Sequence, residues 1–283
     1  MTHEEKKALE IFALNVREDI LKSTTAAGSG HPGGSLSAAD YLTYLYNKEI
    51  KVDAKNPQNP NRDRFVLSKG HSAPALYSVL ARKGFFPVED LMTLRKKNSY
   101  LQGHPSLKHT PGVDASTGSL GQGISTACGM AQGAKVLGLD INVYALLGDG
   151  EIAEGEVWEA MLFAAHYKLE NLCIAVDVNG LQIDGKTCDV MNTEPLDKKF
   201  EAFGCRVIKI DGHNFDELEN AFKFFHENKN STQPTVILMH TIKGKGVSFM
   251  ENEAGWHGKA AKPAECEKAL AELENTRKKI LES

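Results

Sequence analysis

The stretch VYALLGDGEIAEGEVWEAMLFAAHYKLENLCIAVDVNG, residues 143–180, decides the fold class. It contains two apolar runs, 143–147 and 172–178, which have the length and character of strands buried on both faces. Between them, apolar residues recur at helical spacing over about 154–167. A strand, a helix and a second strand in this order predict a parallel β-α-β unit.

The same alternation of strand and helix patterns extends outward from this unit. Further strands are expected at 64–67, 207–210 and 235–241. The helices expected beside them cover about 4–26, a segment with Leu76, Val79 and Leu80, about 120–137, a segment begun by a capping box of Asn214 and Glu217, and about 263–282. We therefore expect an α/β fold, a mostly parallel sheet with helices on both faces, as a single domain over residues 1–283.

Composition excludes several classes of protein. The chain has 283 residues, with 33 Lys and Arg against 37 Asp and Glu, and this near-neutral balance argues against a nucleic-acid partner. No apolar run reaches the roughly 18 residues of a membrane span, and the N-terminus MTHEEKKALE lacks an apolar signal core. The five widely spaced cysteines include no CxxC pair, which argues against a disulfide framework or a Cys-based zinc site and favours the cytoplasm.

Two patterns near the N-terminus predict local structure: a match to a dinucleotide-binding motif and a possible helix start. GSGHPG at 28–33 matches the dinucleotide fingerprint GxGxxG, but a helical pattern precedes it where that fingerprint needs a strand. A NAD-dependent dehydrogenase is therefore kept only as an alternative. A Gly-rich break is expected over 29–35, after which Ser37 and Asp40 predict a capping-box-like start of the next helix.

The helix expected at 120–137 is unusually rich in glycine. Each glycine lowers helix propensity by about 1 kcal/mol, so glycines at these positions need a reason. Gly121 and Gly123, at the helix start, indicate that another backbone or a ligand approaches closely. Gly129 and Gly133 fit this reading and ordinary helix–helix packing equally well.

Polar residues follow both strands of the central β-α-β unit. Asp149 comes directly after the first strand, and Asn179 follows the second strand, 30 residues later. Both should reach the edge of the sheet where open α/β folds bind ligands. A carboxylate and an amide oxygen form an incomplete ligand set that suits Mg²⁺, which completes its octahedron with phosphate and water. Gly150 and the following helix N-terminus, near Glu154, favour a phosphate there, whereas GDG alone would fit an ordinary turn.

A GDG followed by Asn at this distance resembles the signature of thiamine-diphosphate enzymes. Further segments narrow the resemblance: SGHPGGSLSAAD at 29–40, FVLSKGHSAPALY at 65–77, GHPS at 103–106, STGSLGQGIS at 116–125, GDGEIAEGEVWEA at 148–160, NG and IDG between 179 and 185, and IDGH at 210–213. In order and spacing, these resemble the N-terminal, diphosphate-binding domain of transketolases over roughly residues 8–260. The resemblance implies the thiamine-diphosphate-binding fold.

The resemblance also implies roles for individual residues. It places Mg²⁺ on Asp149, Asn179 and the carbonyl of Leu181. The cofactor contacts that it implies are Lys69, His71, Gly150 and Lys243 at or near the diphosphate, Gly118 and Leu120 at the aminopyrimidine, and also Asn179 and His257. The active-site histidines that it implies, around the thiazolium and the substrate hydroxyls, are His31, His71, His104 and His257.

Two roles are possible for Glu154. It matches a family glutamate that joins a carboxylate network across the subunit interface. An acidic residue at a helix start also complements the positive end of the helix dipole without any such network.

Half of the expected cofactor site lies outside this sequence. In transketolases, the acid that activates thiamine diphosphate belongs to the next domain, whereas this sequence ends in one charged helix. We therefore expect the N-terminal subunit of a split transketolase, active in an α2β2 assembly with a separate pyrimidine-binding C-terminal subunit. It would transfer a two-carbon ketol unit from a ketose phosphate to an aldose in pentose phosphate metabolism. The alternatives are a related ketol-transfer subunit of different sugar specificity and a non-catalytic, cofactor-binding or regulatory subunit.

Overall fold

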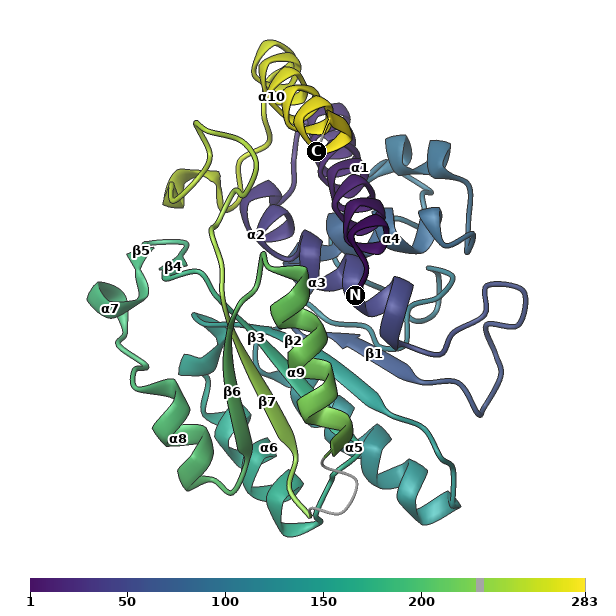
Figure 1. The fold of residues 1–283 in the computed structure, drawn as a ribbon, viewed down its shortest axis with the longest axis vertical. Coiled ribbons are helices and arrows are strands. Elements are labelled where there is room, and N and C mark those ends of the chain that lie inside the picture. Colours follow the sequence, from purple (N-terminus) through teal and green to yellow (C-terminus); the bar gives the residue numbers. More distant parts are fainter. Residues whose placement is uncertain (228–231, 283) are drawn as a thin grey trace.

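The computed structural model describes residues 1–227 and 232–282. At its centre is a parallel sheet with the strand order β1-β2-β3-β7-β6 (Figure 1). Every neighbouring pair in this sheet is parallel. Its strands are β1 Arg64–Leu67, β2 Val143–Gly148, β3 Leu172–Val178, β6 Arg206–Asp211 and β7 Thr235–His240. A short antiparallel ribbon, β4 Leu181–Gln182 with β5 Gly185–Lys186, lies beside the main sheet. The predicted α/β fold is confirmed.

Helices cover both faces of the sheet (Figure 1). The longer ones are α1 His3–Ala27, α4 Ala73–Arg82, α5 Gln122–Leu137, α6 Gly155–His166, α9 Phe215–Glu227 and α10 Pro263–Glu282. Shorter helical turns are α2 Pro32–Ser37, α3 Ala39–Tyr44, η1 Leu45–Glu49, η2 Gly70–Ser72, η3 Val88–Thr93, η4 Glu151–Ala153, α7 Thr187–Val190, α8 Leu196–Ala202 and η6 Ala254–Trp256. The long helices lie where the sequence predicts them. No helix in the described ranges is long and apolar enough to cross a membrane.

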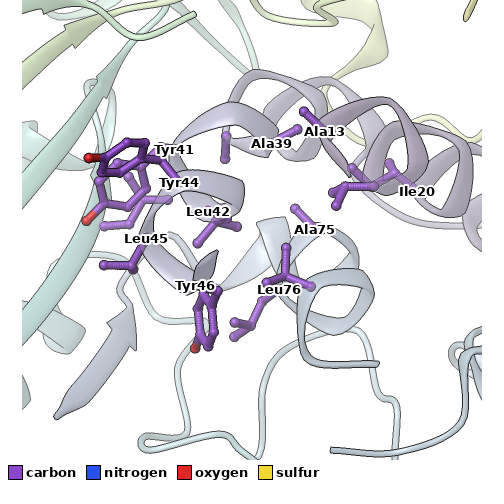
Figure 2. Close-up of a cluster of buried hydrophobic side chains, with 14 of the residues drawn as sticks. Ala13, Ile20, Ala39, Tyr41, Leu42, Tyr44, Leu45, Tyr46, Ala75 and Leu76 are labelled. Atoms are coloured by element: carbon purple, nitrogen blue, oxygen red, sulfur yellow. The ribbon is translucent and has the colours of Figure 1, made fainter. Parts of the chain in front are cut away.

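Alternate strand residues divide the core into two clusters, one on each face. On β2, Tyr144 and Leu146 pack toward α1, α3, α4 and α9, whereas Ala145 and Leu147 pack toward α5 and α6. Figure 2 shows part of the first cluster, in which side chains of α1, α3, η1 and α4 meet. Because both faces are buried, the strands read as continuous apolar runs, which is why the sequence predicts them well.

In the N-terminal part of the chain, one expectation is confirmed and one is corrected. The segment 28–33 follows helix α1, so the GxGxxG match lacks the strand that a nicotinamide site needs. The expected break over 29–35 is shorter than predicted, because α2 begins at Pro32, a residue suited to a first helical turn.

The capping box predicted at Ser37 and Asp40 is wrong. Helix α3 begins after Ala38 without any side-chain cap. The Ser37 hydroxyl instead donates to the Asp177 carboxylate at 2.6 Å. The Asp40 carboxylate pairs with the Arg17 guanidinium at 2.6 Å and contacts Nδ1 of His213 at 2.7 Å. Burial of these charged groups requires partners, and that requirement outweighs a local cap.

The glycines of α5 differ in what surrounds them. Gly121 caps the helix at a φ of +83°, and a Cβ there would lie 2.8 Å from Cβ of Glu154. A Cβ on Gly123 would lie 2.7 Å from Cα of Ser68. The predicted approach of another backbone is confirmed at Gly123, whereas the group that approaches Gly121 is the side chain of Glu154. In the described structure, a Cβ added to Gly129 or Gly133 would have no atom of another segment within 4 Å, so neither helix packing nor backbone approach within this chain explains these two glycines.

Substituting alanine at two glycines of α5 tests this difference. Gly129→Ala should raise the free energy of unfolding by up to about 1 kcal/mol, because alanine loses less backbone entropy in a helix. Gly123→Ala should lower it by about 1–3 kcal/mol, because the added methyl overlaps the backbone at Ser68. Urea unfolding of the isolated chain measures both variants. Equal effects at the two positions would contradict the packing described for α5.

Candidate active site

The loops that follow four parallel strands converge at one edge of the sheet. Lys69 and His71 follow β1, Asp149 follows β2, Asn179 follows β3, and Lys243 follows β7. Strands that run in parallel end at the same edge, where open α/β sheets bind ligands. These loops line a cavity of about 330 Å³, a size typical of cofactor sites.

Most of the residues proposed from the sequence line this cavity: Lys69, His71, Leu120, Asp149, Gly150, Glu154, Asn179, Leu181, Lys243 and His257. Gly34, Gly148, Glu151, Ala153, Gln182 and Ile183 complete its wall. His31, His104 and Gly118 lie just beyond it. His31 stands beside the cavity histidines, and a Cβ on Gly118 would lie 3.0 Å from the His104 ring.

The expected metal ligands lie together on one side of the cavity. The Asp149 carboxylate accepts hydrogen bonds from the amides of Gly150 at 2.8 Å and Gly180 at 2.6 Å. Burial, reinforced by the nearby Asp177, raises the pKa of Asp149 to about 6. Oδ1 of Asn179 accepts from the Leu181 amide at 3.1 Å. One carboxylate, one amide oxygen and the Leu181 carbonyl form an incomplete set of hard oxygen ligands.

This set differs from a self-sufficient metal centre. Within residues 1–227 and 232–282, no group of three or more His, Cys, Asp or Glu side chains could hold a metal ion by itself. A cation that binds beside Asp149 therefore needs further oxygens from a ligand. Mg²⁺ behaves in this way, because it is commonly held by one or two carboxylates plus substrate phosphates and water.

The opposite side of the cavity is suited to an anion. The Ser72 hydroxyl is buried without a hydrogen-bond partner. A Cβ on Gly34 would lie 3.2 Å from this hydroxyl, 3.4 Å from Nε2 of His71 and 3.5 Å from Nζ of Lys69. Because Gly34 has no side chain, these three polar groups converge on one point of its backbone, and Gly34, Lys69 and His71 line the cavity. A hydroxyl, an imidazole and an ammonium that converge in this way fit the oxygens of a diphosphate.

Lys243 supplies a second buried cation. Its Nζ lies 3.4 Å from the Leu181 carbonyl and 3.0 Å from Nδ1 of His257. Burial, with the nearby charge of Lys69, lowers the pKa of Lys243 to about 8. The ammonium therefore remains charged at neutral pH although the surroundings disfavour it.

The four histidines proposed from the sequence form one cluster. The ring centroids of His31, His71 and His257 lie 5.0 to 5.4 Å from one another, and His104 lies 6.3 Å from His31. Burial, followed by neighbouring cations, lowers the pKa of His31 to about 4 and that of His257 to about 3. Burial also lowers the pKa values of His71 and His104. The cluster is therefore neutral at pH 7 and can both donate to and accept from sugar oxygens.

Histidines that are neutral at pH 7 thus lie beside polar groups suited to a diphosphate and to a cation. A family model described as transketolase, thiamine diphosphate binding domain, matches residues 11–279. The chain belongs to this transketolase family.

Relatives of two lengths share this family. The 6-deoxy-6-sulfo-D-fructose transketolase subunit SqwG of Clostridium sp. (strain MSTE9) is 44% identical over 92% of this chain and 94% of its own length. An apulose-4-phosphate transketolase subunit of Actinobacillus succinogenes is 42% identical, with 96% of each chain covered. The transketolase of Rattus norvegicus is 43% identical over 97% of this chain, which spans only 44% of that relative's length.

Solved transketolases share the fold. The transketolase of Campylobacter jejuni superposes with a TM-score of 0.87 at 32% identity, over 96% of this chain and 45% of that structure. The transketolase of Leishmania mexicana gives a TM-score of 0.85 at 28% identity, over 97% of this chain and 46% of that structure.

Sequence reasoning missed Asp177, which the transketolase-family fold buries at the centre of the site. This carboxylate accepts hydrogen bonds from Ser37 at 2.6 Å, from Lys69, and from the Thr241 hydroxyl. Burial alone would raise its pKa, but the charge of Lys69 and these donors hold the pKa below its usual value. A lone acid inside the apolar run LCIAVDV was the signal that could have identified it.

Glu151 was also missed. Its buried carboxylate accepts from the amides of Gly121 at 2.9 Å and Gly148 at 3.0 Å, and from the Ser68 hydroxyl. Burial raises its pKa. Through these bonds, Glu151 joins the start of α5 to the loops that follow β1 and β2.

Glu154 and Leu120 lie at the open side of the cavity. Glu154 is exposed and occupies the N-cap position of α6, yet its side chain makes no capping hydrogen bond. Leu120 is 36% exposed. Their side chains are therefore accessible at the mouth of the site in this transketolase-family chain.

Replacing the buried cation tests the electrostatics of this site. We expect Lys243→Met to raise the free energy of unfolding at pH 7 by roughly 1–3 kcal/mol, because the folded state no longer holds a desolvated ammonium. The gain should shrink as pH rises above about 8, where the wild-type lysine loses its proton in the folded state before the unfolded one. Urea unfolding at about pH 7 and about pH 9.5 measures this.

Lys223→Met provides the matched control, since that lysine side chain is 60% exposed on α9. Its effect should stay within about 0.5 kcal/mol at both pH values. If Lys243→Met destabilised the chain at pH 7, or if both variants behaved alike, the assigned charge state of Lys243 would be wrong.

Proposed function

We propose that this chain is the N-terminal subunit of a thiamine-diphosphate- and Mg²⁺-dependent transketolase, folded as a single domain over residues 1–283. With a separate pyrimidine-binding C-terminal subunit, it transfers a two-carbon ketol unit from a ketose phosphate to an aldose. The observation that carries the proposal is the cavity in which the Asp149 side, the Gly34 cradle and the histidine cluster face one another.

Oxygen ligands and cationic groups of the cavity would bind different parts of the cofactor and its metal. Asp149, Asn179 and the Leu181 carbonyl would hold Mg²⁺, and Gly150 leaves its backbone accessible to the cofactor. Lys69 and Lys243, with His71 and the Ser72 hydroxyl, would bind the diphosphate oxygens. Leu120 and the backbone of Gly118 would face the aminopyrimidine. Buried cations of this kind need little reorganisation when the anion arrives.

The histidines act on the substrate. Bound thiamine diphosphate supplies a nucleophilic carbon and an electron sink for the two-carbon fragment. His31, His71, His104 and His257 are neutral, so each can donate a hydrogen bond to a developing oxyanion or accept a proton from a sugar hydroxyl. His31, His71 and His257 are only partly exposed, which limits the access of bulk water to them.

A partner subunit is needed to close the site. The cavity opens past Leu120, Glu154 and Ile183, and α5 and α6, which begin beside it, share a face with exposed apolar side chains. Its exposed side chains are Val136 at 74%, Leu137 at 72%, Leu162 at 59%, Tyr167 at 45% and Phe163 at 37%, around the open glycines Gly129 and Gly133. An apolar face of this kind favours subunit contact. We propose an α2β2 assembly in which Glu154 joins a carboxylate network between subunits.

The cysteines indicate the cell compartment of this activity, and the relatives indicate its range of substrates. All five cysteines are free thiols and four are buried, which supports placement in the reducing cytoplasm. Anionic sugars are the proposed substrates, as in the pentose phosphate pathway. The SqwG and apulose-4-phosphate relatives carry the names of other sugars, which favours, as the second candidate, a related ketol transferase of different sugar specificity.

Reconstitution tests the proposed activity. The chain should show no ketol transfer alone, and activity should appear when it is mixed with the C-terminal transketolase subunit of the same organism. That activity should require thiamine diphosphate and be lost on chelation of Mg²⁺. Asp149→Ala should abolish it, whereas Glu274→Ala, at an exposed acid of α10, should not. Full activity of the isolated chain would exclude the split-subunit proposal.

Titration of Asp149 tests the metal site independently of activity. In the cofactor-free chain, its ¹³C-labelled carboxyl should titrate near pH 6, because burial penalises the charged form. Thiamine diphosphate with Mg²⁺ should move this titration to lower pH, since a bound cation favours the carboxylate. Asp149→Asn identifies the signal by removing it. A titration that loading leaves unchanged would exclude Asp149 as a ligand.

A further inference from the structure

Arg95 lies beside the histidine cluster in a conformation that non-glycine residues rarely adopt. Its φ is +59°, and its amide donates to the Leu101 carbonyl at 2.8 Å. A left-handed conformation at such a residue costs about 1 kcal/mol or more, and residues held this way concentrate at functional sites. Arg95 was not among the residues that the sequence singled out.

The guanidinium of Arg95 rests on the backbone of Gly103. A Cβ on Gly103 would lie 2.7 Å from Cζ and 2.8 Å from Nη2 of Arg95. Any side chain at Gly103 would therefore displace the guanidinium. Gly103 immediately precedes His104, so the same loop that holds Arg95 also carries a histidine of the cluster.

The direct polar contact of this guanidinium is with a histidine. Its Nη2 lies 3.5 Å from Nδ1 of His31. Across the described parts of the chain, no carboxylate pairs with Arg95, and the segment 91–113 that surrounds it contains no Asp or Glu. The charge of Arg95 thus acts on the histidines, and it is the largest cause after burial of the lowered pKa values of His31 and His104.

The chemistry of the two groups determines where the proton of His31 lies. A guanidinium has only donors, so the nitrogen that faces it must offer a lone pair. Nδ1 of His31 is therefore unprotonated, and the ring proton sits on Nε2. That nitrogen is on the other side of the ring, where a Cβ on Gly258 would lie 3.6 Å away. Lys243 faces Nδ1 of His257 in the same way, at 3.0 Å.

We propose that Arg95 is a positioning residue that holds His31 as a neutral Nε2–H tautomer, so that His31 presents a hydrogen-bond donor to a substrate oxygen. The role of the donor rests on the proposed transketolase function. The tautomer itself depends only on this chain. His31 is faced by Arg95, His71, His104 and His257, and Lys243 acts on it at longer range, so no acid among the described residues competes for its proton.

Nitrogen NMR of the cofactor-free chain tests the proposal without any partner or substrate. In ¹⁵N-histidine-labelled protein, His31 should show an unprotonated Nδ1 and a protonated Nε2 at pH 7. His31→Asn assigns these signals by removing them. In Arg95→Met, which keeps an unbranched apolar side chain but has no donor, both nitrogen shifts should move toward the average of the two tautomers. The titration of His31 should also move to higher pH, because a neighbouring positive charge is gone.

Two further variants separate this role from general support of the loop. Arg95→Lys keeps a donor-only cation and should retain the wild-type His31 signals. Gly103→Ala keeps Arg95 but displaces its guanidinium, so it should reproduce the Arg95→Met spectrum. The signals of His166 and His226, which belong to α6 and α9, report whether the fold is intact.

Two results would overturn the proposal: a protonated Nδ1 on His31 in the wild-type chain, or unchanged His31 signals in a folded Arg95→Met chain. Both concern the isolated subunit. A failed reconstitution would exclude the transketolase assignment and leave the tautomer result standing, so the two outcomes remain distinguishable.

Discussion

The arrangement of the site depends on one buried ion pair, between Lys69 and Asp177. Their side chains are 2% and 0% exposed, so the pair has lost its hydration, at a free-energy cost of several kcal/mol per ion. The structure offsets this cost with donors from Ser37 and Thr241 and with the Gly34 carbonyl, which accepts from Lys69 at 3.0 Å. These bonds join α2 to strand β3 and to the loops that follow β1 and β7. The pair therefore fixes the relative position of the segments that form the cavity.

Around this pair, cations and neutral histidines are packed close together, an arrangement that lowers the stability of the folded chain. Lys243 has a depressed pKa, and the histidines stay uncharged because burial and adjacent positive groups oppose their protonation. The surrounding protein holds these groups in place before any ligand arrives. Such sites reduce the stability of the fold and gain binding energy when an anion enters, a trade-off common at active sites.

The strands and long helices could be predicted because apolar periodicity is local, and β3 is a clear example. The individual site residues came from the resemblance to transketolases, since spacing alone indicated only Asp149, Gly150 and Asn179. The failures share a physical cause. Ser37 and Asp40 match a helix-cap pattern, but Ser37 hydrogen-bonds to buried Asp177 and Asp40 pairs with buried Arg17. These partners, like those of Arg95, are set by contacts between distant segments, which no local pattern records.

The strand order has a consequence for synthesis of the protein. Strand β7 is the last of the described strands to be made, yet it lies inside the sheet, between β3 and β6. Among these strands, β6 pairs only with β7, so it has no place in the sheet until residues 235–240 have left the ribosome. Lys243 follows directly, and with it the second cation of the cavity. A growing chain therefore cannot bring Lys69, Asp149 and Lys243 together around the cavity until all of these strands have been made.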